Sequence, residues 1–213
     1  MVHSWSVVVP AKRLALAKTR LRPLTGGAGP IHEELILALL ADTVAAAVAC
    51  PAVGSVLVVT DEPAAADVAR ALGARPTADA PDRGLNAALD HGALLAGGAA
   101  LAALSSDLPA LRPEQLADAL TEAAGSARCF VPDAQGTGTT LLTAVGAPLA
   151  PRFGPDSARA HRDSGARALV GHWPGLVQDV DTEADLRAAL ALGAGPRTTG
   201  FAARFAGQLR TAR

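Results

Sequence analysis

Three aspartates are the strongest candidates for chemistry in this chain: Asp107, Asp179 and Asp181. Asp107 follows an apolar run of Ala and Leu that ends at Ser105, and the chain then turns at Pro109. A short apolar run bounded by turn residues predicts a strand that is buried on both faces. Ligands of open α/β sheets bind at the carboxyl ends of the strands, which is where this prediction puts Asp107. The alternative is that Asp107 caps the next helix or closes a turn.

Asp179 and Asp181 belong to the run LVQDVD, residues 176–181, which we predict to be the last strand. Side chains two apart on an extended chain share one face, so both carboxylates can point at one spot. Residues 182–185 have the pattern of a capping box, which leaves these two aspartates without a structural role. If this strand ends beside the Asp107 strand, three carboxylates converge, and they repel one another unless a cation lies between them. Carboxylate oxygens suit Mg2+ that carries substrate phosphates.

A basic segment follows the first predicted strand. Residues 10–30 contain Lys12, Lys18 and Arg20 but no acidic residue. Cations and backbone N–H groups at the carboxyl end of a strand suit the phosphates of a nucleotide. The segment has neither the GxxxxGK[ST] nor the GxGxxG pattern, and the alternative is a solvated basic loop.

Two smaller groups of residues are weaker candidates. Gly84 and Asn86 begin a predicted helix, where Gly permits close backbone approach and Asn offers a donor and an acceptor to a base or ribose. Thr139 lies in a turn rich in Gly and Thr, and Gly154 and Ser157 precede a short polar helix. These three can hold a carboxylate or a phosphate through N–H and hydroxyl donors. Ordinary helix capping is the alternative for both groups.

Strands and helices alternate along the predicted chain. Strands are expected at residues 5–9, 55–60, 75–77, the run before Ser105, 129–131, 141–145 and 176–181. Helices are expected at residues 31–49, from 63 to 72, after Gly84, at 113–124, after Ser157, and before Leu192. His32 is expected to be a surface or first-turn residue. We expect a single domain over residues 1–213, in which residues 193–213 form a linker followed by a basic tail, with a helix from Phe201 as one option.

Composition narrows the classes of partner. The chain has 213 residues, and half of them are hydrophobic. Its net charge of −1 gives no electrostatic sign of binding to nucleic acid or to an acidic membrane. The N-terminus lacks the charge and length pattern of a signal peptide, and no apolar run reaches the ~18 residues that span a bilayer. Cys50 and Cys129 form no metal-spaced pair and suggest reduced thiols. We expect a soluble, cytoplasmic protein.

Seven blocks of sequence resemble one enzyme family, the phospholactate/phosphoenolpyruvate guanylyltransferases of deazaflavin coenzyme F-420 biosynthesis. The blocks are VVPAKRLALAKTRL, VVTDE, GLNAAL, SSDLPAL, GTGTTLL, FGPDSARAH and VQDVDTEADL, and they span nearly the whole chain. The LxAGxGxRM pattern of the wider nucleotidyltransferases is absent.

The resemblance implies an α/β fold, specifically a Rossmann-like nucleotidyltransferase fold with three α/β/α layers and a mixed, mainly parallel sheet. It implies Mg2+-dependent transfer of GMP from GTP to the phosphate of phosphoenolpyruvate or 2-phospho-L-lactate, with release of pyrophosphate. The Ala- and Arg-rich composition hints at an actinobacterial source and so favours phosphoenolpyruvate. The oligomeric state stays open, a homodimer included.

The resemblance also implies roles for the candidate residues. Asp107, Asp179 and Asp181 would hold the metal, and Thr139, Gly154 and Ser157 would bind the phosphorylated acid. The nucleotide would lie near these residues: Lys12, Lys18, Arg20, Gly84 and Asn86.

Two alternatives remain. A nucleotidyltransferase with another acceptor, such as a sugar phosphate or a molybdopterin, would keep the aspartates and the basic segment. A non-catalytic module that binds GTP or a phosphometabolite would not need three carboxylates.

Overall fold

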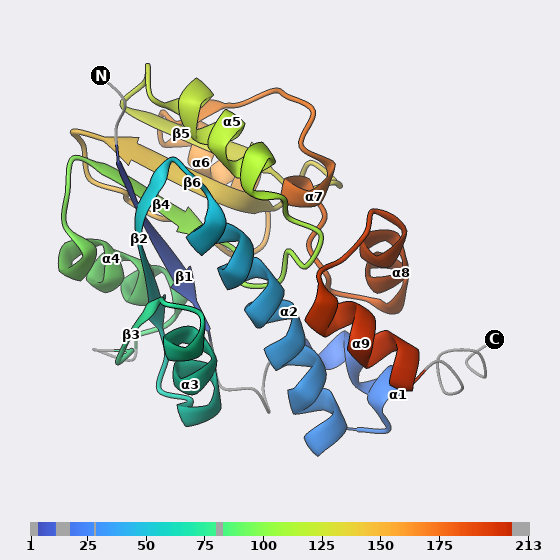
Figure 1. Ribbon diagram of the computed structural model, residues 1–213. Helices are drawn as coiled ribbons and strands as arrows, with labels where there is room; N and C mark the ends of the chain where they lie inside the picture. Colours follow the sequence, from blue (N-terminus) through green and yellow to red (C-terminus); the bar gives the residue numbers. More distant parts are fainter. Residues whose placement is uncertain (1–3, 12–17, 28, 80–82, 206–213) are drawn as a thin grey trace.

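A seven-stranded sheet forms the centre of the protein (Figure 1). The computed structural model describes residues 4–11, 18–27, 29–79 and 83–205. The strands are β1 (Trp5–Pro10), β2 (Val53–Val59), β3 (Arg75–Thr77), β4 (Ala100–Leu104), β5 (Arg128–Pro132), β6 (Thr139–Val145) and β7 (Arg167–Ala168). Their order across the sheet is β3-β2-β1-β4-β6-β5-β7. Only β6 runs antiparallel to its neighbours, β4 and β5, so the predicted mixed, mainly parallel sheet is confirmed.

Helices cover both faces of this sheet. They are α1 (Arg22–Thr25), α2 (Pro30–Ala49), α3 (Pro63–Ala71), α4 (Leu85–Ala96), α5 (Pro113–Ala123), α6 (Ser157–Asp163), α7 (Pro174–Val177), α8 (Glu183–Ala191) and α9 (Pro196–Arg204), with a 3-10 turn, η2, at Thr19–Leu21. Alternate residues of β1 show the layering, since Val7 and Val9 pack with α2, α3 and α5 while Val8 packs with α4 and α6. Gly92 of α4 permits close packing here, because a Cβ at this position would lie 2.6 Å from Val8 Cγ1.

The middle strand β4 is the element that positions Asp107. It pairs with β1 on one side and with β6 on the other, and four of its five residues are buried. Apolar residues without an alternating polar partner are what a strand covered on both faces requires. The prediction of a buried strand before Ser105 is therefore confirmed.

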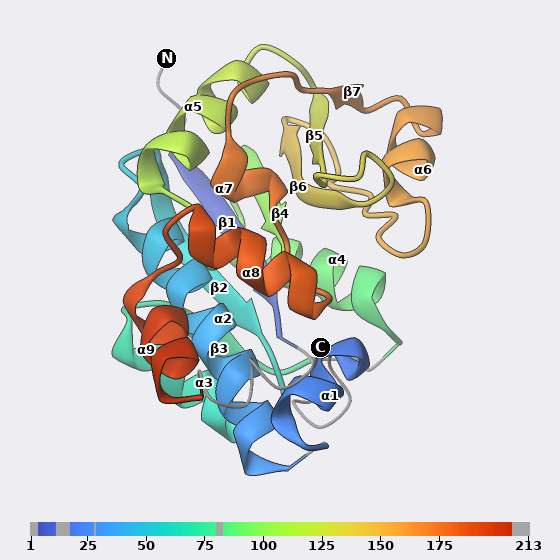
Figure 2. The ribbon, with the colours of Figure 1, turned by 90° about the vertical axis from the view of Figure 1, so that its right-hand side faces the viewer.

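A second layer of helices closes one end of the molecule (Figure 2). Helices α1, α2, α8 and α9 share an apolar cluster that includes Leu21, Leu39, Leu186 and Phe201. Asp42 of α2 binds the first turn of α9, where its carboxylate accepts the backbone N–H of Thr198 at 2.8 Å. Residues 196–204 are therefore a packed helix. The predicted linker is wrong for residues 196–200, because the helix begins before Phe201, with Phe201 as its apolar anchor and Asp42 as its cap.

The prediction of a strand at residues 176–181 is also wrong. Residues 174–177 form α7, and residues 178–181 continue without a strand partner. Both edges of β4 are occupied by β1 and β6, so this segment has no open edge beside Asp107. It crosses the end of the sheet, and the N–H of Val180 donates to the carbonyl of Asp107 at 3.1 Å.

Two further local predictions need correction. The basic segment is not a plain loop, since residues 19–25 form η2 and α1. His32 lies in the first turn of α2 as expected but is fully buried beside Thr25, with 3.2 Å between His32 Nδ1 and Thr25 Oγ1. Among the described helices, none is long and apolar enough to cross a membrane.

Thr43 links α2 to the turn that carries Asp107, and this link can be tested. Its buried hydroxyl accepts the N–H of Leu108 at 2.9 Å and donates to the carbonyl of Leu39. Thr43→Val leaves the N–H of Leu108 without its partner, so we expect the free energy of unfolding to fall by about 1–3 kcal/mol. Urea unfolding measures this loss as a lower midpoint, while the dependence of the free energy of unfolding on urea concentration stays unchanged.

Thr121→Val is the matched control. The exposed hydroxyl of Thr121 makes the same bond to the carbonyl four residues earlier, at 2.8 Å, but accepts no N–H from another element. Its expected effect is within about 0.5 kcal/mol. Equal losses in the two variants would contradict the role assigned to Thr43.

Candidate active site

A cavity of about 810 Å³ opens at the carboxyl ends of β1 and β4. Its volume is within the range of pockets for ligands of drug or cofactor size. The predicted site residues that line it are Lys18, Arg20, Asp107, Thr139, Gly154, Ser157, Asp179 and Asp181. Because β6 is antiparallel to β4, the start of β6 brings Thr139 to the edge where β4 ends.

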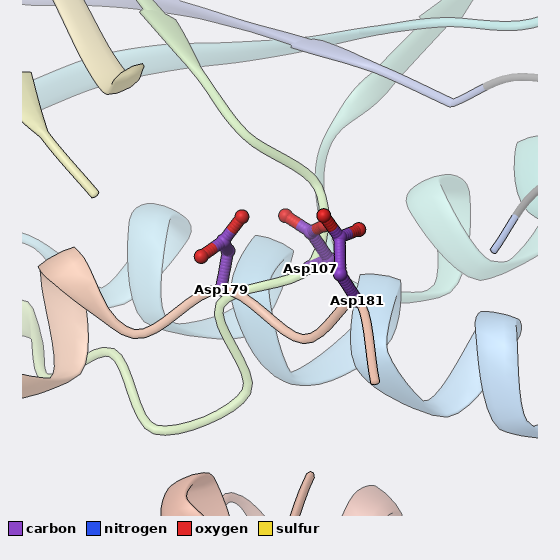
Figure 3. A group of neighbouring side chains, drawn as sticks. All are labelled: Asp107, Asp179 and Asp181. Carbon is purple, nitrogen blue, oxygen red and sulfur yellow. The ribbon is translucent and has the colours of Figure 1, made fainter. Parts of the chain in front are cut away.

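The three aspartates converge in this cavity (Figure 3). One carboxylate oxygen from each of Asp107, Asp179 and Asp181 lies within 4.8 Å of the others. Figure 3 shows that Asp107 comes from the chain that leaves β4, and that the other two come from the segment that crosses it. Three hard oxygen donors at this separation form a donor set that fits Mg2+.

Val180 explains how a segment outside the sheet still places two aspartates on one side. Val180 is fully buried in the cluster of α1, α2, α8 and α9, and its N–H is bound to Asp107. Neighbouring side chains on an extended backbone point to opposite sides, so Asp179 and Asp181 face away from that cluster. The predicted capping box of α8 holds the end of the segment, because Asp185 Oδ2 accepts the N–H of Thr182 at 2.8 Å.

Lys18 supplies the positive charge among the carboxylates. Its ammonium forms ion pairs with Asp107 and with Asp181. Burial by itself would lower the pKa of Lys18, but the charges of Asp107 and Asp181 outweigh it and raise this pKa above its ordinary value. Lys18 holds φ 47°, an uncommon conformation for a residue with a side chain.

The surroundings of Asp179 disfavour its ionised form. Burial and then the charge of Asp107 raise its pKa to about 7, while Lys18 acts in the opposite direction. A further cation at this place would favour the ionised carboxylate.

Another part of the cavity wall, at Thr139, Gly154 and Ser157, carries the groups predicted for the acid. Thr139 is buried at the start of β6, and its Oγ1 lies 2.9 Å from Nδ1 of the fully buried His161. Ser157 is also buried, at the start of α6. Gly154 has φ 139°, a conformation that a side chain would strain although nothing lies within 4 Å of a Cβ placed there.

Two of the predicted nucleotide-binding residues, Asn86 and Gly84, differ from the expectation in their placement. Asn86 accepts the N–H of Phe153 at 2.7 Å and donates to its carbonyl at 3.0 Å, so its amide anchors the loop beside Gly154. Asn86 and Gly84 are absent from the cavity lining formed by the described residues. Lys12 lies outside the described residues.

Asp133, which lines the cavity, and His161, which lies behind Thr139, were not predicted as site residues from the sequence. Asp133 accepts the N–H groups of Thr137 and Gly138, both at 2.9 Å, and shapes the turn before Thr139. His161 follows Ser157 by four residues, the spacing that puts two side chains on one helix face. This spacing could have placed His161 beside the predicted Ser157. The sequence offers no indication that His161 is buried, because it lies in a short polar helix.

A mixed α/β sheet with a convergent carboxylate set and basic residues at its ligand-binding edge is typical of nucleotidyltransferases. Solved structures agree on the fold. A nucleotidyl transferase from Methanothermobacter thermautotrophicus matches with a TM-score of 0.62 at 20% identity, over 89% of this chain and 97% of that one. A protein from Desulfovibrio desulfuricans, described as a nucleotide-diphospho-sugar transferase, matches with a TM-score of 0.71 at 16% identity, over 97% and 96%.

The chain belongs to the family of CofC-like guanylyl transferases, whose model matches residues 5–207. A phosphoenolpyruvate guanylyltransferase from Geodermatophilus obscurus is 65% identical over 97% of this chain and 99% of its own. One from Streptomyces coelicolor is 54% identical over 94% and 97%. The resemblance stated from the sequence is confirmed.

The ion pairs of Lys18 generate a stability prediction. Its side chain is 18% exposed and that of Asp107 is 11% exposed, so Lys18→Met leaves the carboxylates partly buried without a counter-charge. We expect a loss of about 1–3 kcal/mol in the free energy of unfolding without added divalent cation. Arg20→Met is the control, because Arg20 is exposed and takes part in none of the ion pairs between described residues; its effect should stay within about 0.5 kcal/mol. Unchanged stability of Lys18→Met would refute the bridging role.

His161 generates a prediction about acid. Burial, then the charges of Arg128 and Arg152, lower its pKa from the ordinary 6.5 to about 4. Between these values the unfolded chain binds a proton that the folded protein does not, so stability is complete above pH 6.5 and declines as the pH falls toward 4. The decline from this residue amounts to about 3 kcal/mol at most.

Urea unfolding of the wild type and of His161→Gln at several pH values measures this contribution. The variant cannot titrate at this position, so the stability advantage of the wild type should shrink on acidification. A constant difference would contradict the lowered pKa.

Proposed function

We propose that this protein transfers GMP from GTP to the phosphate of phosphoenolpyruvate and releases pyrophosphate, with Mg2+ as cofactor, in coenzyme F-420 biosynthesis. The observation that carries the proposal is the geometry of one cavity, in which a three-carboxylate set lies at one side and the hydroxyls of Thr139 and Ser157 lie at another. The names of the relatives support the choice of nucleotide and acceptor.

The reaction requires little acid or base chemistry from the protein. A phosphate oxygen of phosphoenolpyruvate attacks the α-phosphorus of GTP and forms a new P–O bond. The bond from that phosphorus to the oxygen that bridges to the β-phosphate breaks, and pyrophosphate leaves with the electron pair. Because the attacking phosphate is already a dianion, no general base is needed, and catalysis consists of positioning and charge neutralisation.

Asp107, Asp179 and Asp181 would hold Mg2+, which supplies charge neutralisation and polarises phosphoryl oxygens. Lys18 then no longer has to neutralise the carboxylates, and its ammonium is available to a phosphate oxygen. Arg20 lines the same side of the cavity and adds a second cation. The carboxylates act as ligands in this scheme and do not move protons.

Thr139, Gly154 and Ser157 would bind the phosphorylated acid. Gly154 has no side chain that could separate an anion from the backbone, and Asn86 holds the adjacent peptide of Phe153 in place. Thr139, Gly154 and Ser157 line the same cavity as the carboxylate set, so the acid would be bound in the cavity that would also hold the nucleotide and the cation.

Pyrophosphate release tests the proposal directly. Purified protein with GTP and Mg2+ is supplied with phosphoenolpyruvate, 2-phospho-L-lactate or 3-phosphoglycerate in turn. We expect release with phosphoenolpyruvate and none when Mg2+ is omitted. Release with 2-phospho-L-lactate alone would keep the reaction and change the acceptor, whereas no release with any acid or any nucleoside triphosphate would refute the enzyme assignment and favour a binding module.

Asp107→Asn serves as the site variant in the same assay. It should reduce turnover by at least about 100-fold, because the cation site loses a charge, while far-ultraviolet circular dichroism stays unchanged. Asp163→Asn, at an exposed carboxylate on α6, is the matched control with wild-type turnover. Near-normal turnover of Asp107→Asn would refute the metal assignment.

A further inference from the structure

His161 has no role in the reaction described so far, yet it is the most enclosed polar side chain beside the acid-binding wall. It is fully buried in α6 and packs between two aromatic rings, with ring centroids 5.8 Å from Phe130 and 5.1 Å from Phe153. Both of its ring nitrogens have partners. Nε2 lies 2.9 Å from the backbone nitrogen of Arg152, and Nδ1 lies 2.9 Å from Oγ1 of Thr139.

The partner at Nε2 determines which nitrogen carries the proton. A backbone N–H can only donate, so Nε2 of His161 must accept from Arg152. Neutral imidazole has one donor and one acceptor nitrogen, and the ring is neutral because its pKa is lowered to about 4. The proton therefore resides on Nδ1, and Nδ1–H donates to Oγ1 of Thr139.

This bond determines the direction of the Thr139 hydroxyl. Its oxygen accepts from His161, so its own proton must point elsewhere, and no group in the described part of the chain accepts it. Thr139 lines the cavity. The proton of a buried hydroxyl that faces a cavity is available to an acceptor there.

We propose that His161 is a positioning residue that fixes the hydroxyl of Thr139 as a hydrogen-bond donor to an anionic oxygen of the acceptor acid. This inference rests on the proposed function for the identity of that acid. It adds that Thr139 favours a carboxylate or phosphate oxygen of the ligand over a hydrogen-bond donor. A donor on the ligand would face the proton of the Thr139 hydroxyl and could not form a hydrogen bond with it. Ser157 lacks such a partner among the described residues, so its hydroxyl can rotate to donate or accept.

The tautomer can be measured without substrate. Nitrogen-15 NMR of the protein labelled at its histidine nitrogens distinguishes a protonated from an unprotonated ring nitrogen, and His161→Gln identifies the signal. We expect the Nδ1–H form near neutral pH. The Nε2–H form, or the doubly protonated ring, would overturn the inference whatever the enzyme does.

Four variants test the action through Thr139. In His161→Gln the side-chain oxygen can replace Nε2 as acceptor for Arg152, but the donor to Thr139 is lost. In His161→Asn the amide nitrogen can replace Nδ1 as donor to Thr139, but the acceptor for Arg152 is lost. Thr139→Val removes the hydroxyl itself, and Thr139→Ser retains it.

The expected result is a change in KM for the acid. His161→Gln and Thr139→Val should each raise KM for phosphoenolpyruvate by about tenfold and leave KM for GTP within about twofold. His161→Asn and Thr139→Ser should stay within about threefold of the wild type. In the Thr139→Val background, His161→Gln should add no further increase, because the histidine acts through the hydroxyl.

The outcomes separate this inference from the proposed function. Additive increases in KM, or an equal rise for GTP, would show a merely structural histidine and overturn the inference. If the wild type releases no pyrophosphate with any acid, the proposed function fails, and the NMR measurement still decides the tautomer of His161.

Discussion

The convergence of three carboxylates at the end of β4 is the constraint on which the site depends. Like charges in a partly buried place raise the free energy of the folded state unless a cation compensates them. Lys18 provides that compensation through its ion pairs with Asp107 and Asp181, and it does so in a left-handed backbone conformation. A strained conformation of this kind persists only where the surroundings hold it.

Backbone hydrogen bonds make this convergence rigid. The Asp107 carbonyl receives the N–H of Val180, and the neighbouring N–H of Leu108 is held by the Thr43 hydroxyl. Beyond Asp181, the capping box of α8 begins within one residue. The aspartates are therefore positioned by the sheet, by α2 and by α8 together. A cation that binds them is met by ligands already in place, which reduces the ordering cost of binding.

The cavity wall at Thr139, Gly154 and Ser157 is organised differently, because neutral side chains there hold neutral backbone and hydroxyl groups in place. Asn86 uses both ends of its amide on the backbone of Phe153, and His161 uses both ring nitrogens on Arg152 and Thr139. Buried polar groups whose hydrogen bonds are all made specify one arrangement of their surroundings. The charged groups of the cavity are thus gathered at Lys18 and the three aspartates, where the proposed function puts the nucleoside triphosphate. The oriented neutral groups lie around Thr139, where the proposed function puts the small acid.

The sequence by itself determined the class of fold, most of the elements and the family. Apolar runs followed by turn residues identified β1, β2 and β4, and the pattern at residues 182–185 identified a capping box that the structure contains. Asp107 and the pair Asp179 and Asp181 could be proposed as one site because each was placed at the end of a predicted strand, although the second of these strands does not form. Local patterns suffice for these features because they depend on neighbours in the sequence.

Only the tertiary structure decided the rest. Residues 176–181 read as a strand, yet β1 and β6 already occupy both edges of β4. The end of this segment therefore crosses the sheet end, where the N–H of Val180 binds the carbonyl of Asp107. Residues 196–200 read as a linker, yet Asp42, which is far away in sequence, caps them as the start of a helix. Lys18 as the partner of Asp107 and Asp181, and His161 as the partner of Thr139, are long-range pairs of the same kind. No local pattern encodes them, because each depends on which side chains the packed sheet and helices bring within hydrogen-bonding distance.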